Sequence, residues 1–94
     1  MGDLQVKICV CGLWHLGLVT AASLSELGNK VYGFDENENT ISDLKKNIYP
    51  IFEPGLNDLI KKKSSDGSLV FTNELNSVSN EVNIFWVCCD TPVN

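Results

Sequence analysis

Two glycines at a fixed spacing are the first residues in this sequence that suggest chemistry. Gly12 and Gly17 occupy the first and third glycine positions of the pattern G-x-G-x-x-G, directly after the apolar run 6–11. In that pattern the first glycine makes a tight turn, the second lets the backbone approach a pyrophosphate, and the third lets a helix lie close against a sheet. Trp14 replaces the middle glycine. The indole therefore either swings aside, so that the amides still meet a phosphate at the helix N-terminus, or fills the phosphate position itself.

An acidic residue follows at the distance that a dinucleotide site requires. Asp35 lies 23 residues after Gly12, at the end of a second apolar run. A carboxylate at this point accepts hydrogen bonds from a ribose 2′-hydroxyl and repels a 2′-phosphate, so the sequence favours NAD over NADP. Glu36 adds negative charge, and no arginine lies nearby. The alternative is that Asp35 is only a turn or helix-capping residue.

Two further polar residues lie near the expected site. His15 is the only histidine and falls at the start of the predicted helix, where it either contacts a phosphate or has a surface or packing role. Thr91 follows the last apolar run, and its hydroxyl either contacts the cofactor at the carboxyl end of the sheet or belongs to a turn with Pro92. The sequence thus predicts a binding site without an evident reaction centre.

The cysteines do not add a second site. Cys9, Cys11, Cys88 and Cys89 fall in the most apolar parts of the chain, and neither pair has C-x-x-C spacing. We expect buried, reduced structural thiols, with Cys9 and Cys11 on one face of a strand; a thiol-based metal or redox role is the alternative.

The elements that must position these residues alternate along the chain. Hydrophobic periodicity and turn residues predict strands and helices in the order β-α-β-α-α-β-α-β. The expected strands are 6–11, 30–34, 69–72 and 83–89, and the expected helices are 15–27, 37–47, 55–63 and 73–79. The inner face of the first helix is assigned to Leu16, Val19, Ser23 with Leu24, and Leu27, and that of the second to Ile41, Leu44 and Ile48.

This order predicts the α/β class: a partial Rossmann-like parallel sheet of about four strands, in the order 3-2-1-4, with helices on both faces. The run Ile84–Val87 has four consecutive apolar residues, which indicates a strand buried on both faces. Because no fifth strand covers its free edge, we also expect self-association, most simply as a homo-oligomer.

Composition limits the function classes. Ninety-four residues make one domain, and the net charge of −5 argues against a nucleic-acid or anionic-membrane partner. No apolar run reaches the ~20 residues that span a bilayer, and the first residues carry an acid and no apolar leader. We therefore expect a cytoplasmic protein.

Four blocks together resemble one known family. The segments ICVCGLWHLGLVTAASLSELGNKVYGFD, PIFEPGL, LVFTNEL and IFWVCCDTP are similar to the N-terminal part of UDP-glucose/GDP-mannose dehydrogenases, over nearly the whole chain. The resemblance implies oxidation of the C6 alcohol of a nucleotide sugar to a carboxylate with two NAD. It also implies a set of cofactor contacts: Gly12, Leu13, Trp14, His15, Leu16, Gly17, Asp35, Thr40 and Thr91.

Three departures from the family pattern stand out. Trp14 and His15 replace the usual Gly-Tyr, Thr40 lacks the usual basic head group, and Asp90 replaces Gly or Asn. The family's nucleophilic cysteine, its catalytic lysine and its sugar-nucleotide site lie later in a much longer chain. We therefore expect residues 1–94 to be the N-terminal part of an NAD-binding Rossmann domain, a fragment that is inactive alone and meets a nucleotide sugar only in the full-length enzyme. The alternative is a stand-alone, non-catalytic nucleotide-binding or assembly module.

Overall fold

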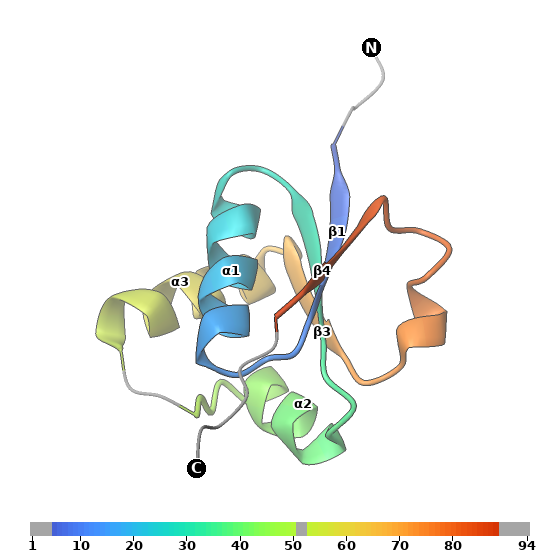
Figure 1. Ribbon diagram of the computed structural model, residues 1–94. Helices are drawn as coiled ribbons and strands as arrows, with labels where there is room; N and C mark the ends of the chain where they lie inside the picture. Colours follow the sequence, from blue (N-terminus) through green and yellow to red (C-terminus); the bar gives the residue numbers. More distant parts are fainter. Residues whose placement is uncertain (1–4, 51–52, 89–94) are drawn as a thin grey trace.

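A four-stranded parallel sheet forms the centre of the molecule (Figure 1). The computed structural model describes residues 5–50 and 53–88. The strands follow the order β3-β2-β1-β4, and every neighbouring pair is parallel, which confirms the predicted α/β class and strand order. Their bounds are β1 Lys7–Cys11, β2 Lys30–Phe34, β3 Leu69–Thr72 and β4 Ile84–Val87.

Within the described residues, three α-helices and one 3-10 helix connect the strands. Helices α1 and α3 lie together on one side of the sheet, and the connection 73–83, which includes the 3-10 helix, lies on the other (Figure 1). That 3-10 helix is three residues long, where the sequence predicts a longer helix over 73–79. The bounds are α1 His15–Glu26, α2 Glu38–Lys45, α3 Pro54–Ser65 and the 3-10 helix Leu75–Ser77.

The core forms where α1 packs on the sheet. Ile8, Val10 and Val31 are buried, and α1 covers them with Leu18 and the small residues Ala21 and Ala22. The predicted inner face of α1 is wrong in part: Leu16 is 51% exposed and Leu27 is 78% exposed, whereas Leu24 packs against the core as predicted. Small side chains let a helix approach a sheet closely, so the face with Gly17 and Ala21 turns inward although the neighbouring face is more hydrophobic.

Strand β4 also differs from the prediction. Its side chains are 45–66% exposed, whereas the sequence pattern indicates burial on both faces. In the described part of the chain β4 pairs only with β1. Asn83 fixes the start of the pairing, since its side chain accepts a hydrogen bond from the Lys7 amide at 2.9 Å.

Helix α2 begins with a side-chain cap. The Asn37 side chain accepts hydrogen bonds from the amides of Asn39 and Thr40, which confirms the predicted start of α2. Ile48 lies beyond the end of α2 and is 53% exposed, so its assignment to the inner face is wrong. Among the residues placed here, no helix has the length and apolar character needed to cross a bilayer.

Candidate functional site

The turn that follows β1 lies at the carboxyl edge of the sheet, where the strand order reverses between β1 and β4. Gly12 makes this turn with a φ of +95°, a conformation that side chains other than hydrogen rarely allow. A Cβ on Gly12 would stand 2.3 Å from the carbonyl oxygen of Cys88, at the end of β4. The chain thus needs glycine at position 12 both for its backbone conformation and for its contact with β4.

The second glycine closes the same turn from the helix side. A Cβ built on Gly17 would stand 1.7 Å from the carbonyl oxygen of Gly12. Backbone therefore packs directly on backbone where α1 begins, so α1 is held close against the turn. These are the first and third glycines of the motif, and the structure gives each a steric reason.

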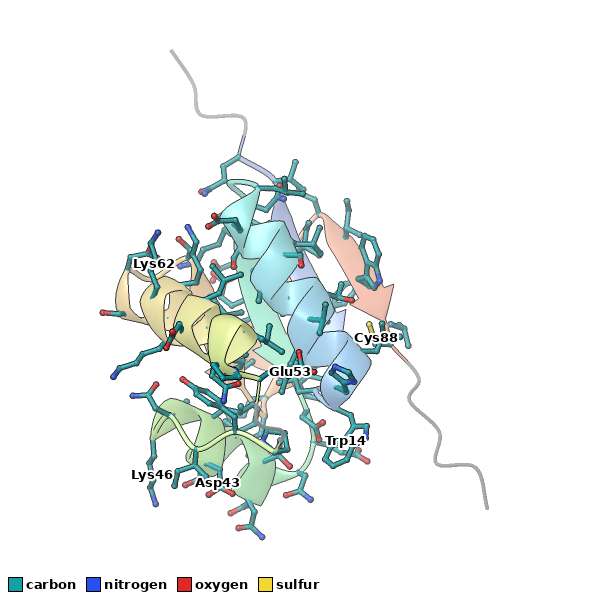
Figure 2. The ribbon with its side chains drawn as sticks, turned by 90° about the vertical axis from the view of Figure 1, so that its left-hand side faces the viewer. Trp14, Asp43, Lys46, Glu53, Lys62 and Cys88 are labelled. Carbon is teal, nitrogen blue, oxygen red and sulfur yellow. The ribbon has the colours of Figure 1, made fainter. Side chains whose placement is uncertain are left out.

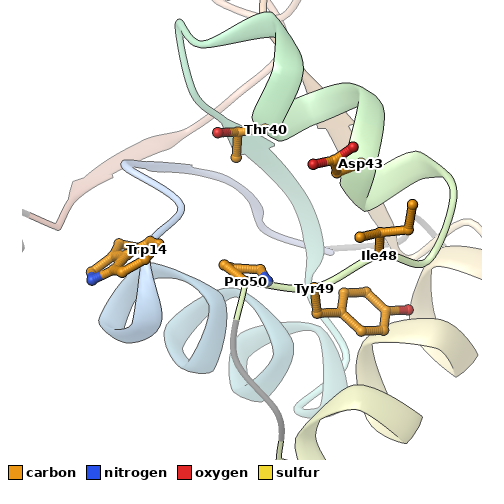
Figure 3. A pocket seen from close by; sticks show the side chains of 6 residues that line it. All are labelled: Trp14, Thr40, Asp43, Ile48, Tyr49 and Pro50. Atoms are coloured by element: carbon orange, nitrogen blue, oxygen red, sulfur yellow. The ribbon is translucent and has the colours of Figure 1, made fainter.

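Trp14 precedes α1 and takes the N-cap position. Its φ of −97° suits a side chain, and the side chain makes no cap hydrogen bond. The indole is 55% exposed and forms one wall of a pocket of about 100 Å³ between the start of α1, α2 and the segment that follows α2 (Figure 3). The other lining residues are Thr40, Asp43, Ile48, Tyr49 and Pro50. The indole thus lies near α2, and Thr40 of α2 lines the same pocket.

Asp35 joins two loops of the site. Its Oδ2 accepts a hydrogen bond from the Leu13 amide at 3.0 Å, and its Oδ1 accepts one from the Asn37 amide at 3.0 Å. Asp35 therefore has the turn role that the sequence offered as the alternative to ribose binding. Because each carboxylate oxygen has a second acceptor position, the same side chain retains capacity for the hydroxyls of a ribose.

His15, the first residue of α1, pairs with a residue that sequence reasoning did not single out. Its Nε2 lies 2.9 Å from Oε2 of Glu53, and both side chains are half exposed. Glu53 is the N-cap of α3, but its side chain makes no cap bond with α3 and lies beside the first turn of α1 (Figure 2). The only available signal was its place in the PIFEPGL segment.

The remaining predicted residues divide into buried, exposed and undescribed ones. The Leu13 side chain is in the core, with only 1% exposed, so its backbone is the part available to a ligand. Leu16 is exposed. Thr91 lies outside the described residues, so its predicted contact stays a prediction.

The described thiols lie in β1 and directly after β4, whereas Cys89 lies outside the described residues. The sulfurs of Cys9 and Cys11 are 3.9 Å apart, as expected for one face of a strand, and Cys88 Sγ lies 3.8 Å from Thr20 Oγ1. Burial raises the pKa of the Cys9 thiol to about 12, so the thiol stays neutral and unreactive near neutral pH. Within ranges 5–50 and 53–88, no group of three or more His, Cys, Asp or Glu residues could hold a metal ion.

Known proteins with similar sequences carry the same segment at the start of longer chains. UDP-glucose 6-dehydrogenase TuaD of Bacillus subtilis is 40% identical over 88 residues, which are 94% of this chain and 19% of that protein. UDP-N-acetyl-D-mannosamine dehydrogenase of Methanococcus maripaludis is 36% identical over 92 residues, or 97% of this chain and 21% of that protein. The chain therefore spans about one fifth of the length of these relatives.

Solved structures agree with this relationship. GDP-mannose dehydrogenase from Pseudomonas aeruginosa superposes with a TM-score of 0.83 at 30% identity, over 93% of this chain and 20% of that one. UDP-D-ManNAc dehydrogenase from Pyrococcus horikoshii superposes with a TM-score of 0.86 at 29% identity, over 95% and 21%. The model of the UDP-glucose/GDP-mannose dehydrogenase family, NAD binding domain, matches residues 6–94. The chain belongs to the UDP-glucose/GDP-mannose dehydrogenase family and carries its NAD-binding domain.

Proposed function

We propose that this chain binds NAD across the glycine turn and Asp35, as the N-terminal part of the NAD-binding domain of a nucleotide-sugar 6-dehydrogenase. One observation carries the proposal: the Asp35 carboxylate holds the amide of Leu13 and still has acceptor positions for a ribose. This hydrogen bond holds the residue proposed to bind the ribose, Asp35, next to the glycine turn proposed to bind the pyrophosphate. A Cβ at Gly12 or Gly17 would strike backbone, so both glycines keep the turn close-packed, and a turn of this kind is what the dinucleotide motif uses.

In this proposal the pyrophosphate lies at the N-terminus of α1, where backbone amides and the helix dipole favour an anion. The contacts come from the backbone of residues 12–17 and from His15, with Thr40 on the ribose side and Thr91 completing the set. The exposed indole of Trp14, on the wall of the pocket beside α2, supports the alternative in which it stands aside. Asp35 and Glu36 place two carboxylates where a 2′-phosphate would lie, which favours NAD over NADP.

The reaction itself belongs to parts of the enzyme outside these 94 residues. NAD supplies a hydride acceptor, and two NAD together oxidise a C6 alcohol to a carboxylate, as in the synthesis of uronic-acid precursors of polysaccharides. We assign no catalytic residue to this chain and expect the chain alone to be inactive, the nucleotide sugar being bound only by the full-length enzyme. A cytoplasmic location accords with the free thiols of Cys9 and Cys11, whose sulfurs lie 3.9 Å apart without a disulfide bond.

A second candidate function rests on β4. Its four apolar side chains are 45–66% exposed, which suits a non-catalytic module that assembles through this edge, or a homo-oligomer. The sequence that follows residue 94 in the gene separates the two candidates. Continuing dehydrogenase sequence supports the first candidate, and a stop codon there supports the second.

The proposal is tested by titrating the purified protein with NAD and with NADP by isothermal titration calorimetry. Saturable binding of NAD, weaker binding of NADP, and loss of NAD binding in Asp35→Ala are expected. Trp14→Gly serves as the comparison for the indole. Binding by Trp14→Gly but not by the wild type would show that the indole fills the phosphate position. Failure of NAD to bind either protein would count against the proposal.

A further inference from the structure

A carboxylate already lies beside the start of α1. The first turn of α1 contains no acidic residue and receives no side-chain cap. Glu53 comes from another element, since it is the N-cap of α3 and lies 38 residues after His15 in the sequence. Its Oε2 is 2.9 Å from His15 Nε2. The single negative side chain paired with His15 therefore comes from the loop that leads into α3.

The Glu53 carboxylate does not serve its own helix. An N-cap side chain can accept a hydrogen bond from the first amides of the helix that it precedes. Glu53 makes no such bond with α3. The carboxylate is instead directed to the helix end at which the proposed function places the pyrophosphate.

We propose that Glu53 is a built-in competitor of the dinucleotide, and that a bound pyrophosphate takes His15 over from it; this inference rests on the proposed function. Both anions favour the same imidazole and the same helix end. When the pyrophosphate contacts His15, the Glu53 carboxylate loses its partner and remains as a nearby negative charge. Glu53 thus lowers the affinity for NAD, whereas His15 raises it.

The size of the effect follows from the exposure of the pair. The side chains of His15 and Glu53 are 52% and 48% exposed, so solvent screens the interaction and a bound anion displaces it easily. Exposed ion pairs correspond to about a twofold to fivefold change in an equilibrium constant. Glu53→Gln should therefore tighten NAD binding about twofold to fivefold, and His15→Asn should weaken it by a similar factor.

The chain offers a matched control. Glu26 at the end of α1 pairs with Lys63 at 3.1 Å and is 53% exposed, close to the exposure of Glu53. Glu26→Gln makes the same change in net charge and also breaks an ion pair, but at the opposite end of α1. It should leave NAD affinity unchanged, so any effect special to Glu53→Gln cannot come from net charge alone.

The experiment measures NAD affinity by calorimetry for the wild type and these three variants, and follows the imidazole nitrogens of His15 by NMR. Because His15 is the only histidine, its signal needs no assignment. Opposite changes in affinity for Glu53→Gln and His15→Asn, with an imidazole shift on adding NAD or inorganic pyrophosphate, are expected. If NAD binds but both variants weaken binding equally, or the imidazole signal does not move, the inference is overturned while the proposed function stands. If NAD binds to none of the four proteins, both are overturned.

Discussion

Gly17→Ala tests most directly whether the glycine turn is built as described. The new Cβ would lie 1.7 Å from the carbonyl oxygen of Gly12, far inside the 3.0 Å below which real Cβ atoms essentially never approach another atom. The obstacle is backbone, so no side chain can rotate away. Overpacking of this kind costs about 1–3 kcal/mol or more, and the better helix propensity of alanine returns at most about 1 kcal/mol. We expect a net loss of about 2 kcal/mol in the free energy of unfolding, together with loss of NAD binding.

The matched control is Gly55→Ala in the first turn of α3. A Cβ on Gly55 meets nothing within 4 Å, so this variant should be neutral or stabilised by up to about 1 kcal/mol. Urea unfolding followed by circular dichroism measures both free energies, and calorimetry measures NAD affinity. Equal stabilities for the two variants, with NAD binding retained in Gly17→Ala, would refute the steric argument.

Four further predictions follow from burial and hydrogen bonding. Asp35→Ala removes the acceptor of two backbone amides and should cost about 1–2 kcal/mol in urea unfolding; an unchanged stability would show that the two bonds do not hold the loops. Leu18→Ala should lower the free energy of unfolding by about 2–5 kcal/mol, because Leu18 is fully buried. Leu27→Ala, at a 78% exposed position, should change it by less than about 0.5 kcal/mol. A larger loss for Leu27→Ala than for Leu18→Ala would mean that α1 buries the face expected from the sequence. Burial raises the pKa of the Cys9 thiol from 9.0 to about 12. The folded protein therefore gains stability from the neutral thiol below the pKa of the unfolded chain, and loses it as pH rises through 9 toward 12. Cys9→Ala should flatten this decline in the free energy of unfolding, measured from about pH 8 to 10.5, and an identical dependence on pH in the two proteins would contradict the prediction. Trp86→Lys places a charge on the exposed edge strand and should shift sedimentation toward the monomer, while an unchanged distribution would exclude this edge as the contact.

The sequence predicts the elements of this fold well because the relevant signals are local. The bounds expected for β2 and β3 agree with the structure residue for residue, since both strands are short apolar runs between turn residues. The strand order follows from topology rules that hold for nearly all parallel connections. Gly12 and Gly17 were also identifiable, because the motif has a fixed spacing.

The errors concern which side of an element is buried, which depends on its neighbours. For α1, hydrophobicity favours the face with Leu16 and Leu27, but the backbone contact of Gly17 decides the rotation of the helix. For β4, an apolar run indicates a fully covered strand only when something lies on each side of it. The pattern IFWV cannot show that β4 is an edge in the described part of the chain.

In the site, too, residues with a fixed sequence spacing could be predicted, whereas contacts between residues far apart in the sequence could not. Asp35 was found from its distance to Gly12, but its bond with the Leu13 amide requires the structure. The contact between Glu53 and His15 has no local signal, because the two residues are far apart in the sequence and precede or begin different helices. Such a pair has no sequence period, so only the packing of α3 beside α1 reveals it.

The place of β1 in the middle of the sheet determines when the sheet can be completed during folding. Its partner on one side, β2, follows within 30 residues, but the register on the other side pairs Ile8 with Ile84. Closing so long a loop delays the contact, and folding slows as the sequence separation of contacts grows. During synthesis, therefore, one side of β1 stays unpaired until almost the whole segment has left the ribosome. Strand β4 leads into Cys88, whose carbonyl oxygen packs against Gly12, so this side of the glycine turn forms only after β4 has been made.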